Sequence, residues 1–106
     1  MFVCQWHLDV PFGKRGDAIR IMTAWGKDKL AHSGFRKVKG TRVLVGEIGD
    51  SPSHIVDEYV FETLADFEAA LADMGDERFR RHAEALAPYV VPGTQHWRVL
   101  RVLETG

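Results

Sequence analysis

The sequence predicts an α+β fold in which four strands and two helical segments follow one another as strand, helix, strand, strand, helix, strand. Two observations support this prediction. Residues 1–11 alternate between apolar and polar side chains with the period of a β-strand. The clearest turn signal, the Gly-Asp-Ser-Pro-Ser run at residues 49–53, divides the chain into two strand-helix-strand halves of similar length.

The first strand has one apolar and one polar face. Its apolar face carries Phe2, Cys4, Trp6, Leu8 and Val10, and its other face carries Val3, Gln5, His7 and Asp9. The Pro-Phe-Gly run at residues 11–13 ends the strand. A polar row that contains a histidine, on a strand expected at the centre of a sheet, is the strongest chemical lead in the sequence.

The later elements follow from periodicity and turn residues. Apolar side chains at helical spacing predict a helix over residues 17–32, and strands are expected at residues 42–48 and 54–62. Thr63, with Asp66 three residues later, resembles the start of a capped helix. This second helical segment breaks at residues 75–76, restarts and ends at Pro88, and the last strand spans residues 94–103.

This order is the split βαβ pattern of a ferredoxin-like fold, βαββαβ, with a four-stranded antiparallel sheet. Right-handed crossovers place both helical segments on the same face of the sheet. The other face is then bare, although the strands carry large apolar residues on both sides. We therefore expect a homodimer in which this face packs against the sheet of a second copy.

Composition limits the class of protein. We expect residues 1–106 to form one domain, with 45% hydrophobic residues, 27% charged residues and a formal net charge of −1, as in an ordinary soluble protein. There is no basic stripe with interleaved aromatic residues, so nucleic acid is not an expected partner. The absence of a leader and of an apolar stretch of membrane-spanning length favours a cytoplasmic protein that does not associate with membranes.

Two stretches resemble a known superfamily. They are the Val-Pro-Phe-Gly-Lys entry into the first helix and the Tyr-Val-Phe-Glu run at residues 59–62, which leads into Ala-Asp-Phe-Glu at residues 65–68. With the element order, they make the chain resemble the dimeric α+β barrel superfamily. That superfamily includes antibiotic-biosynthesis monooxygenases, ethyl-tert-butyl-ether-degradation-type proteins, NIPSNAP-like proteins and stress-responsive barrel proteins. The resemblance implies a ligand pocket between sheet and helices that often works without a cofactor, and we expect none.

The resemblance also disfavours haem degradation. Haem-degrading members carry a tryptophan and a histidine on the second helix and an asparagine on the first strand. Here the first strand offers Gln5 and His7, and the helix has Ala69 and Ala70 where a tryptophan is wanted. His82 does not fall at the position of the histidine.

The candidate site depends on how the first and third strands align. Laying the second strand-helix-strand half of the chain on the first half aligns the strand at residues 54–62 with the strand at residues 1–11. Gln5 and His7, with the other residues of their face, then lie opposite Asp57 and Tyr59. If these faces point toward the helices, the four side chains line a pocket. Its substrate-binding surface would also include Trp25, Phe61 and Phe67, with His82 either reaching in from the second helical segment or joining a charged surface. The opposite facing, with His7 inside the dimer barrel, stays open.

A histidine beside a carboxylate and a phenol suits proton transfer, with His7 as general acid and base, Asp57 fixing its tautomer and Tyr59 nearby. The rival interpretation makes His7 a hydrogen-bonded core residue. No metal site is expected, because no zinc-binding spacing occurs. We therefore expect an enzyme of secondary, aromatic or polyketide-like metabolism that oxygenates, cyclises, condenses or isomerises a small molecule. The alternative is a non-catalytic ligand-binding or stress-related barrel protein.

Overall fold

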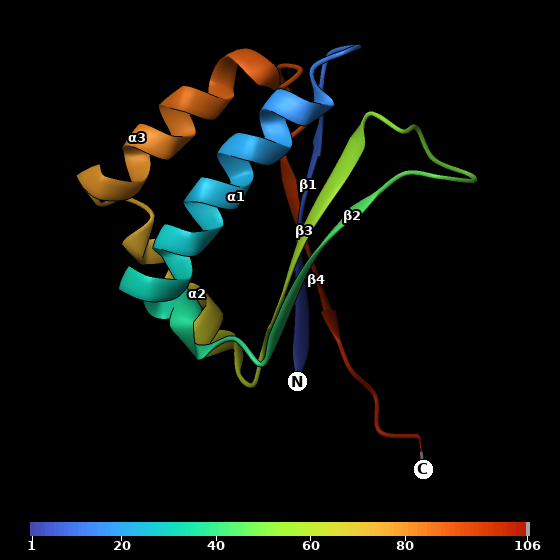
Figure 1. The fold of residues 1–106 in the computed structure, drawn as a ribbon. Coiled ribbons are helices and arrows are strands. Elements are labelled where there is room, and N and C mark those ends of the chain that lie inside the picture. Colours follow the sequence, from blue (N-terminus) through green and yellow to red (C-terminus); the bar gives the residue numbers. More distant parts are fainter. Residues whose placement is uncertain (106) are drawn as a thin grey trace.

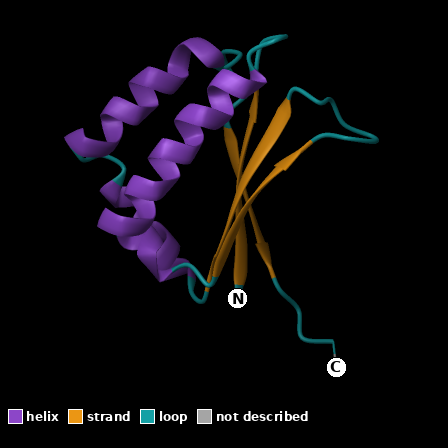
Figure 2. Cartoon of the chain, in the orientation of Figure 1, coloured by secondary structure: helices purple, strands orange, loops and turns teal. Residues whose placement is uncertain are grey.

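The predicted element order is confirmed by the structure, a computed structural model that describes residues 1–105 (Figures 1 and 2). The strands are β1 (Phe2–Asp9), β2 (Gly40–Val45), β3 (His54–Phe61) and β4 (His96–Arg101). The helices are α1 (Arg15–His32), α2 (Leu64–Asp73) and α3 (Glu77–Leu86), with short 3-10 turns η1 (Gly34–Lys37) and η2 (Ala87–Tyr89). Each predicted strand and helix is present, and its observed ends differ from the predicted ones by only a few residues.

The sheet has the strand order β2-β3-β1-β4, and every neighbouring pair is antiparallel. All three α-helices lie on one side of it (Figure 1). This is the ferredoxin-like arrangement that the sequence predicted, with β1 and β3 at the centre. In the described chain the opposite side of the sheet carries no helix, and we call it the open face. None of the helices within residues 1–105 is long and apolar enough to cross a membrane.

The apolar face of β1, not its polar face, lies under the helices. In the antiparallel pairing of β1 with β3, Cys4 lies across from Tyr59 and Trp6 across from Asp57. Residues paired in this way point to the same face of the sheet. The register that put the row of His7 opposite Asp57 is therefore wrong, and the facing that the sequence left open is the one observed. The apolar side chains of β1 face the helices because this facing removes them from water.

The core between sheet and helices consists of two clusters. One gathers Trp6, Leu8, Val10, Ala18, Met22, Trp25, Ile55, Phe79, Leu86 and Val90. The other gathers Cys4, Phe35, Tyr59, Phe61, Phe67 and Ala70. Burial raises the pKa of the Cys4 thiol to about 11, so this side chain is a packing residue and not a reactive thiolate.

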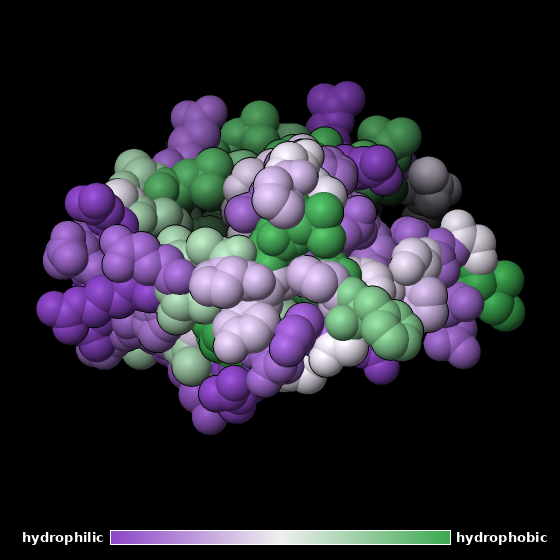
Figure 3. Space-filling view, turned by 90° about the horizontal axis from the view of Figure 1, so that it is seen from above, coloured by the Kyte–Doolittle hydropathy of each residue, from purple (hydrophilic) through white to green (hydrophobic). Residues whose placement is uncertain are grey.

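Polar caps fix the helix ends. The hydroxyl of Thr63 accepts a hydrogen bond from the backbone N–H of Asp66 at 3.1 Å, which confirms the predicted cap of α2. The carboxylate of Asp76 accepts from the backbone N–H of Arg78 at 2.9 Å and starts α3 after the break. Seen from above, the outer side of the helical layer is covered largely by hydrophilic side chains (Figure 3). The helices thus bury one face and leave the other to water.

Two glycines give a test of this packing. A Cβ added at Gly34 would lie 2.9 Å from the backbone Cα of Ala70, whereas one added at Gly26, inside α1, meets no atom within 4 Å. We expect Gly34→Ala to lower the free energy of unfolding by roughly 1–3 kcal/mol. Gly26→Ala should raise it by roughly 0.5–1 kcal/mol, because alanine favours the helix. Urea unfolding measures both, and equal effects would contradict the close approach of η1 and α2.

Candidate functional site

The sheet separates the side chains that the sequence assigned to one site. Trp25, Asp57, Tyr59, Phe61 and Phe67 lie between sheet and helices, Gln5 and His7 lie on the open face, and His82 lies on α3. Alternate side chains of a strand point to opposite faces, and the observed register places the two rows on different sides. The predicted pocket lined jointly by Gln5, His7, Asp57 and Tyr59 is therefore wrong, although the roles of the individual residues stay predictions.

Lys29 on α1 takes the place beside Asp57 that the sequence had given to His7. Lys29 is only 3% exposed, and its Nζ lies 3.5 Å from Oδ2 of Asp57. The hydroxyl of Tyr59 donates a hydrogen bond to the same Oδ2 at 2.5 Å. Lysine and aspartate are rarely buried so completely unless they are paired. These three side chains, which we call the lysine triad, are the best candidate for a chemical site in the helix layer.

Aromatic rings surround the Lys29 amine on several sides. The ring centroids of Trp25 and Tyr59 both lie 4.8 Å from Nζ, that of Phe35 lies at 5.1 Å and that of Trp6 at 5.8 Å. All are close enough for a cation–π interaction. A lysine ammonium has three N–H donors, and Asp57 is its one polar contact within the described chain. The amine therefore retains capacity to bind an oxygen atom of a ligand.

Lys29 lies in the wall of a pocket of about 200 Å³. The pocket is lined by Trp6, Trp25, Lys29, Phe35, Leu71, Met74, Gln95 and Trp97. Gln95 is exposed, so it marks the side on which the pocket meets solvent. The indole N–H of Trp25, a residue of the pocket wall, is buried without a hydrogen-bond partner within residues 1–105. The volume has room for about seven water molecules at ~30 Å³ each, which suits a small ligand.

Burial shifts the lysine triad toward proton exchange. It lowers the pKa of Lys29, and the charge of Asp57 opposes this effect. It raises the pKa of Asp57, against the influence of Lys29 and the Tyr59 hydroxyl. Burial and then Asp57 raise the pKa of Tyr59, so the phenol keeps its proton and acts as a fixed donor. Burial thus weakens the hold of the Lys29 amine on its proton and strengthens that of the Asp57 carboxyl, which brings the proton affinities of the two groups closer together.

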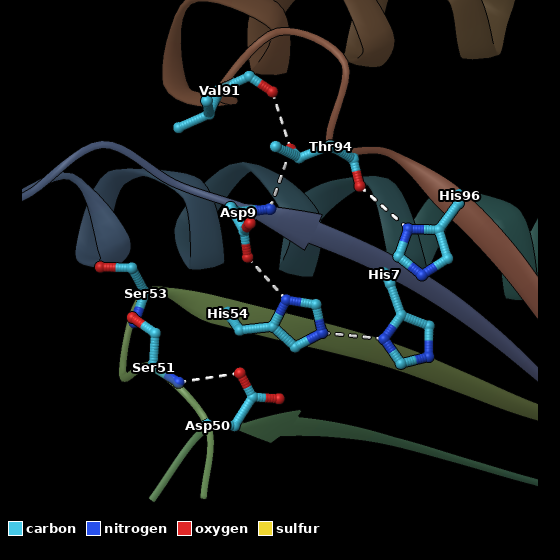
Figure 4. A network of polar contacts seen from close by, with 9 residues as sticks. All are labelled: His7, Asp9, Asp50, Ser51, Ser53, His54, Val91, Thr94 and His96. Atoms are coloured by element: carbon cyan, nitrogen blue, oxygen red, sulfur yellow. Dashed lines mark hydrogen bonds and ion pairs between the residues drawn. The ribbon is translucent and has the colours of Figure 1, made fainter.

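A second polar cluster crosses the open face. Hydrogen bonds and ion pairs join its side chains in the order Arg42, Glu58, Gln5, His7, His54 and Asp9. His54 lies between His7 and Asp9 (Figure 4). The hydrogen bond from Arg42 lowers the pKa of Glu58, which keeps this carboxylate charged. The cluster holds His7 by both ring nitrogens, so His7 has no free nitrogen for a ligand.

The other predicted site residues have structural partners. Phe61 and Phe67 pack against each other in the core with ring centroids 5.7 Å apart. His82 stacks on the outer side of Trp25 at 6.1 Å, and its Nε2 lies 3.1 Å from a carboxylate oxygen of Asp28. His82 therefore faces a polar groove between α1 and α3 and not the pocket beside Lys29. Within the described residues, no group of three or more His, Cys, Asp or Glu side chains is placed to hold a metal ion.

No protein family and no curated protein matches the sequence at a significant level. Solved structures do match. A NIPSNAP family protein from Agrobacterium tumefaciens superimposes with a TM-score of 0.76 at 16% identity, over 99% of this chain and 88% of that one. This chain has a NIPSNAP-like fold. A NIPSNAP domain protein from Burkholderia xenovorans gives a TM-score of 0.74 at 13% identity, over 97% of this chain and 95% of that one.

The same fold occurs in antibiotic-biosynthesis monooxygenase structures. A protein from Nitrosomonas europaea, provisionally assigned to that group, superimposes with a TM-score of 0.68 at 15% identity, over 98% of this chain and all of that one. The fold that the sequence resemblance implied is therefore confirmed. At sequence identities this low, the superpositions show a shared fold and do not show a shared reaction.

Proposed function

We propose that this chain is an enzyme of secondary or aromatic metabolism in the cytoplasm that moves a proton on a small molecule bound between sheet and helices. Lys29 is its acid-base group. The observation that carries the proposal is a buried lysine, paired with Asp57, that lines a pocket and has N–H donors to spare. A titratable group with a shifted pKa inside a pocket is a candidate for catalysis.

The pocket favours a ligand with a ring and an oxygen atom. Trp6, Trp25 and Trp97 supply broad apolar walls on which a planar ring can stack. Lys29, in the pocket wall, offers N–H donors to a carbonyl, enol or phenol oxygen of the ligand. The volume of about 200 Å³ limits the ligand to a small ring compound or a short chain. A small cyclic ketone or phenol meets all three conditions.

The proposed step is a single proton transfer. As a neutral amine, Lys29 takes a proton from a C–H next to a carbonyl group, or from a phenol O–H, and becomes an ammonium. The electron pair stays on the ligand as an enolate or phenolate, whose oxygen the ammonium then holds. Asp57 and Tyr59 position the amine from behind. Isomerisation, cyclisation, condensation and oxygenation can all begin from such a deprotonated ligand, which agrees with the monooxygenase assignment of the neighbour in fold.

Hydrogen exchange into deuterium oxide tests the proposal without knowledge of the final product. A panel of small cyclic ketones is incubated with the protein in deuterium oxide, and proton NMR follows loss of the signal from the C–H next to the carbonyl group. We expect faster exchange than in buffer alone for ring compounds that fit the pocket. Exchange at the buffer rate for every compound, including those shown by calorimetry to bind, would contradict proton transfer.

A non-catalytic ligand-binding protein is the second candidate. A core filled by Trp25, Tyr59 and Phe67 would favour it; Tyr59 and Phe67 are buried in the core and do not line the pocket beside Lys29, whereas Trp25 does. Binding measured by calorimetry, together with exchange at the buffer rate, would favour this candidate over the enzyme.

We also propose that the open face packs against the sheet of a second copy. This face combines Leu100, which is 49% exposed, with the half-buried Leu44 and Val60. Apolar side chains that share one exposed sheet face favour association. None of the helices within residues 1–105 lies on this side, which leaves room for another sheet.

A matched pair of variants tests the homodimer. Leu100→Glu places a charge on the open face and should weaken association by about tenfold or more, because a buried unpaired charge is costly. Leu64→Glu makes the same change at a similarly exposed leucine at the start of α2 and should leave association unchanged. Light scattering during gel filtration measures the mass of each. A wild-type monomer at micromolar concentration would contradict the dimer.

A further inference from the structure

The two histidines of the open-face cluster lie between two hydrogen-bond acceptors. Nδ1 of His54 lies 2.6 Å from the carboxylate of Asp9, and Nε2 of His54 lies 2.8 Å from Nδ1 of His7. Nε2 of His7 lies 3.0 Å from the amide oxygen of Gln5. Figure 4 shows His54 between Asp9 and His7. A carboxylate and an amide oxygen can only accept, so a ring N–H must donate at each end.

The orientation of the Gln5 amide follows from its other neighbour. Its NH₂ group donates to the carboxylate of Glu58 at 2.9 Å, and Glu58 is held in its charged form by Arg42 at 2.5 Å. Turning the amide over would place its oxygen against that carboxylate, with two acceptors in contact. The amide oxygen therefore faces His7, and Nε2 of His7 carries a hydrogen.

Counting hydrogens then fixes the charge of the pair. The three contacts, from Gln5 to His7, from His7 to His54 and from His54 to Asp9, need one hydrogen each. Two neutral imidazole rings supply only two N–H groups. We infer that His7 and His54 share one additional proton and act as a one-proton switch on the open face. The negative charge of Asp9 favours the imidazolium on His54, which leaves His7 neutral with its hydrogen on Nε2.

The groups around His7 and His54 allow the two neutral rings to bind one additional proton but not a second. From β4, the ring of His96 stacks on His7 at 4.8 Å, and Arg98 lies across from Gln5. Arg42 of β2 is paired with Glu58, and the charge of Asp50 in the β2 to β3 turn also acts on His7. Burial, followed by the charges of His54, His96 and Arg98, lowers the pKa of His7, and Asp50 opposes this effect. A second added proton would also set two N–H groups against each other.

The switch predicts a loss of stability on both sides of neutral pH. Below about pH 6.5, histidines of the unfolded chain bind two protons where the native pair binds one, so the free energy of unfolding falls as pH falls. At higher pH, the native pair keeps a proton that the unfolded chain has lost. Stability then falls as pH rises through the release of that proton. His54 begins β3, and its backbone N–H donates to the carbonyl of Ser51, so the switch lies directly beside the turn at residues 49–53.

NMR of the ¹⁵N-labelled protein tests the inference directly. Long-range proton–nitrogen spectra report which ring nitrogens carry hydrogen. At about pH 7.5, where ordinary histidines near pKa 6.5 are mostly neutral, we expect one imidazolium and one neutral ring with its hydrogen on Nε2. The wild-type spectrum alone decides this point, whether or not the chain is a dimer. Two neutral rings, or two charged rings, would overturn the inference.

Asp9→Asn separates hydrogen bonding from simple charge. The amide of an asparagine can donate to Nδ1 of His54, so the cluster becomes complete with two ring hydrogens. We expect the affinity of the pair for its additional proton to fall by about tenfold or more. Asp50→Asn removes the same charge near His7 without touching a histidine hydrogen bond, and its effect should be several times smaller. Equal effects of the two variants would show that no shared proton is held.

Discussion

Replacing Lys29 with methionine is expected to lower the rate of ligand deuterium exchange by about a hundredfold or more, the usual effect of losing an acid-base group. Methionine has nearly the length of lysine and packs well against aromatic rings, so the cage of Trp6, Trp25, Phe35 and Tyr59 stays filled. It cannot bind a proton. Asp57 then accepts a proton and remains hydrogen-bonded to Tyr59, which allows the chain to fold.

Lys27→Met is the matched control, because it makes the same change at an exposed position of the same helix. Its exchange rate should equal that of the wild type. Unchanged exchange in Lys29→Met would contradict the proposed role of the amine. A loss in His7→Gln but not in Lys29→Met would instead place the acid-base group on the open face, where the structure puts His7.

Replacing Asp57 with asparagine is expected to lower the free energy of unfolding by about 3 kcal/mol, as found when one partner of a buried ion pair is removed. The Lys29 amine would remain buried with no counter charge. Its three N–H groups would face aromatic rings and an amide. Urea unfolding measures the change. Asp17→Asn, which breaks an exposed pair with Arg20, should cost less than about 1 kcal/mol.

The double variant Lys29→Met with Asp57→Asn shows whether the loss comes from the pair. With no charge left in the cage, it should regain most of the stability that Asp57→Asn loses. If the double variant instead loses the sum of the unfolding free energies lost by Lys29→Met and by Asp57→Asn, the two side chains act independently. The lysine triad would then not be an energetic unit.

The element order could be predicted because its signals are local. The strand alternation at residues 1–11, the turn at residues 49–53 and the cap at Thr63 each depend on a few neighbouring residues. The facing of β1 could not be predicted in the same way, because alternation shows that two faces differ and not which one the helices cover. That depends on contacts between elements far apart in the chain.

The site was only partly predictable for the same reason. Trp25, Asp57 and Tyr59 do lie in the helix layer, as expected, and Trp25 lines the pocket. Lys29 was missed, although it continues the buried stripe of α1 at helical spacing after Ala18, Met22 and Trp25. A lysine on such a stripe is a signal that sequence analysis can use. Its partner, 28 residues away on β3, is set by the fold and not by any local pattern.

The pocket beside Lys29 also gives the protein a built-in optical probe. The chain contains three tryptophans, and Trp6, Trp25 and Trp97 all line that cavity. Trp6 lies 5.6 Å from Trp25 and 6.4 Å from Trp97, so excitation energy passes readily among the indoles. Intrinsic tryptophan fluorescence from this protein thus originates entirely at the cavity wall. Any small molecule that enters, and any change in the charge of the neighbouring amine, alters the emission without the need for a label.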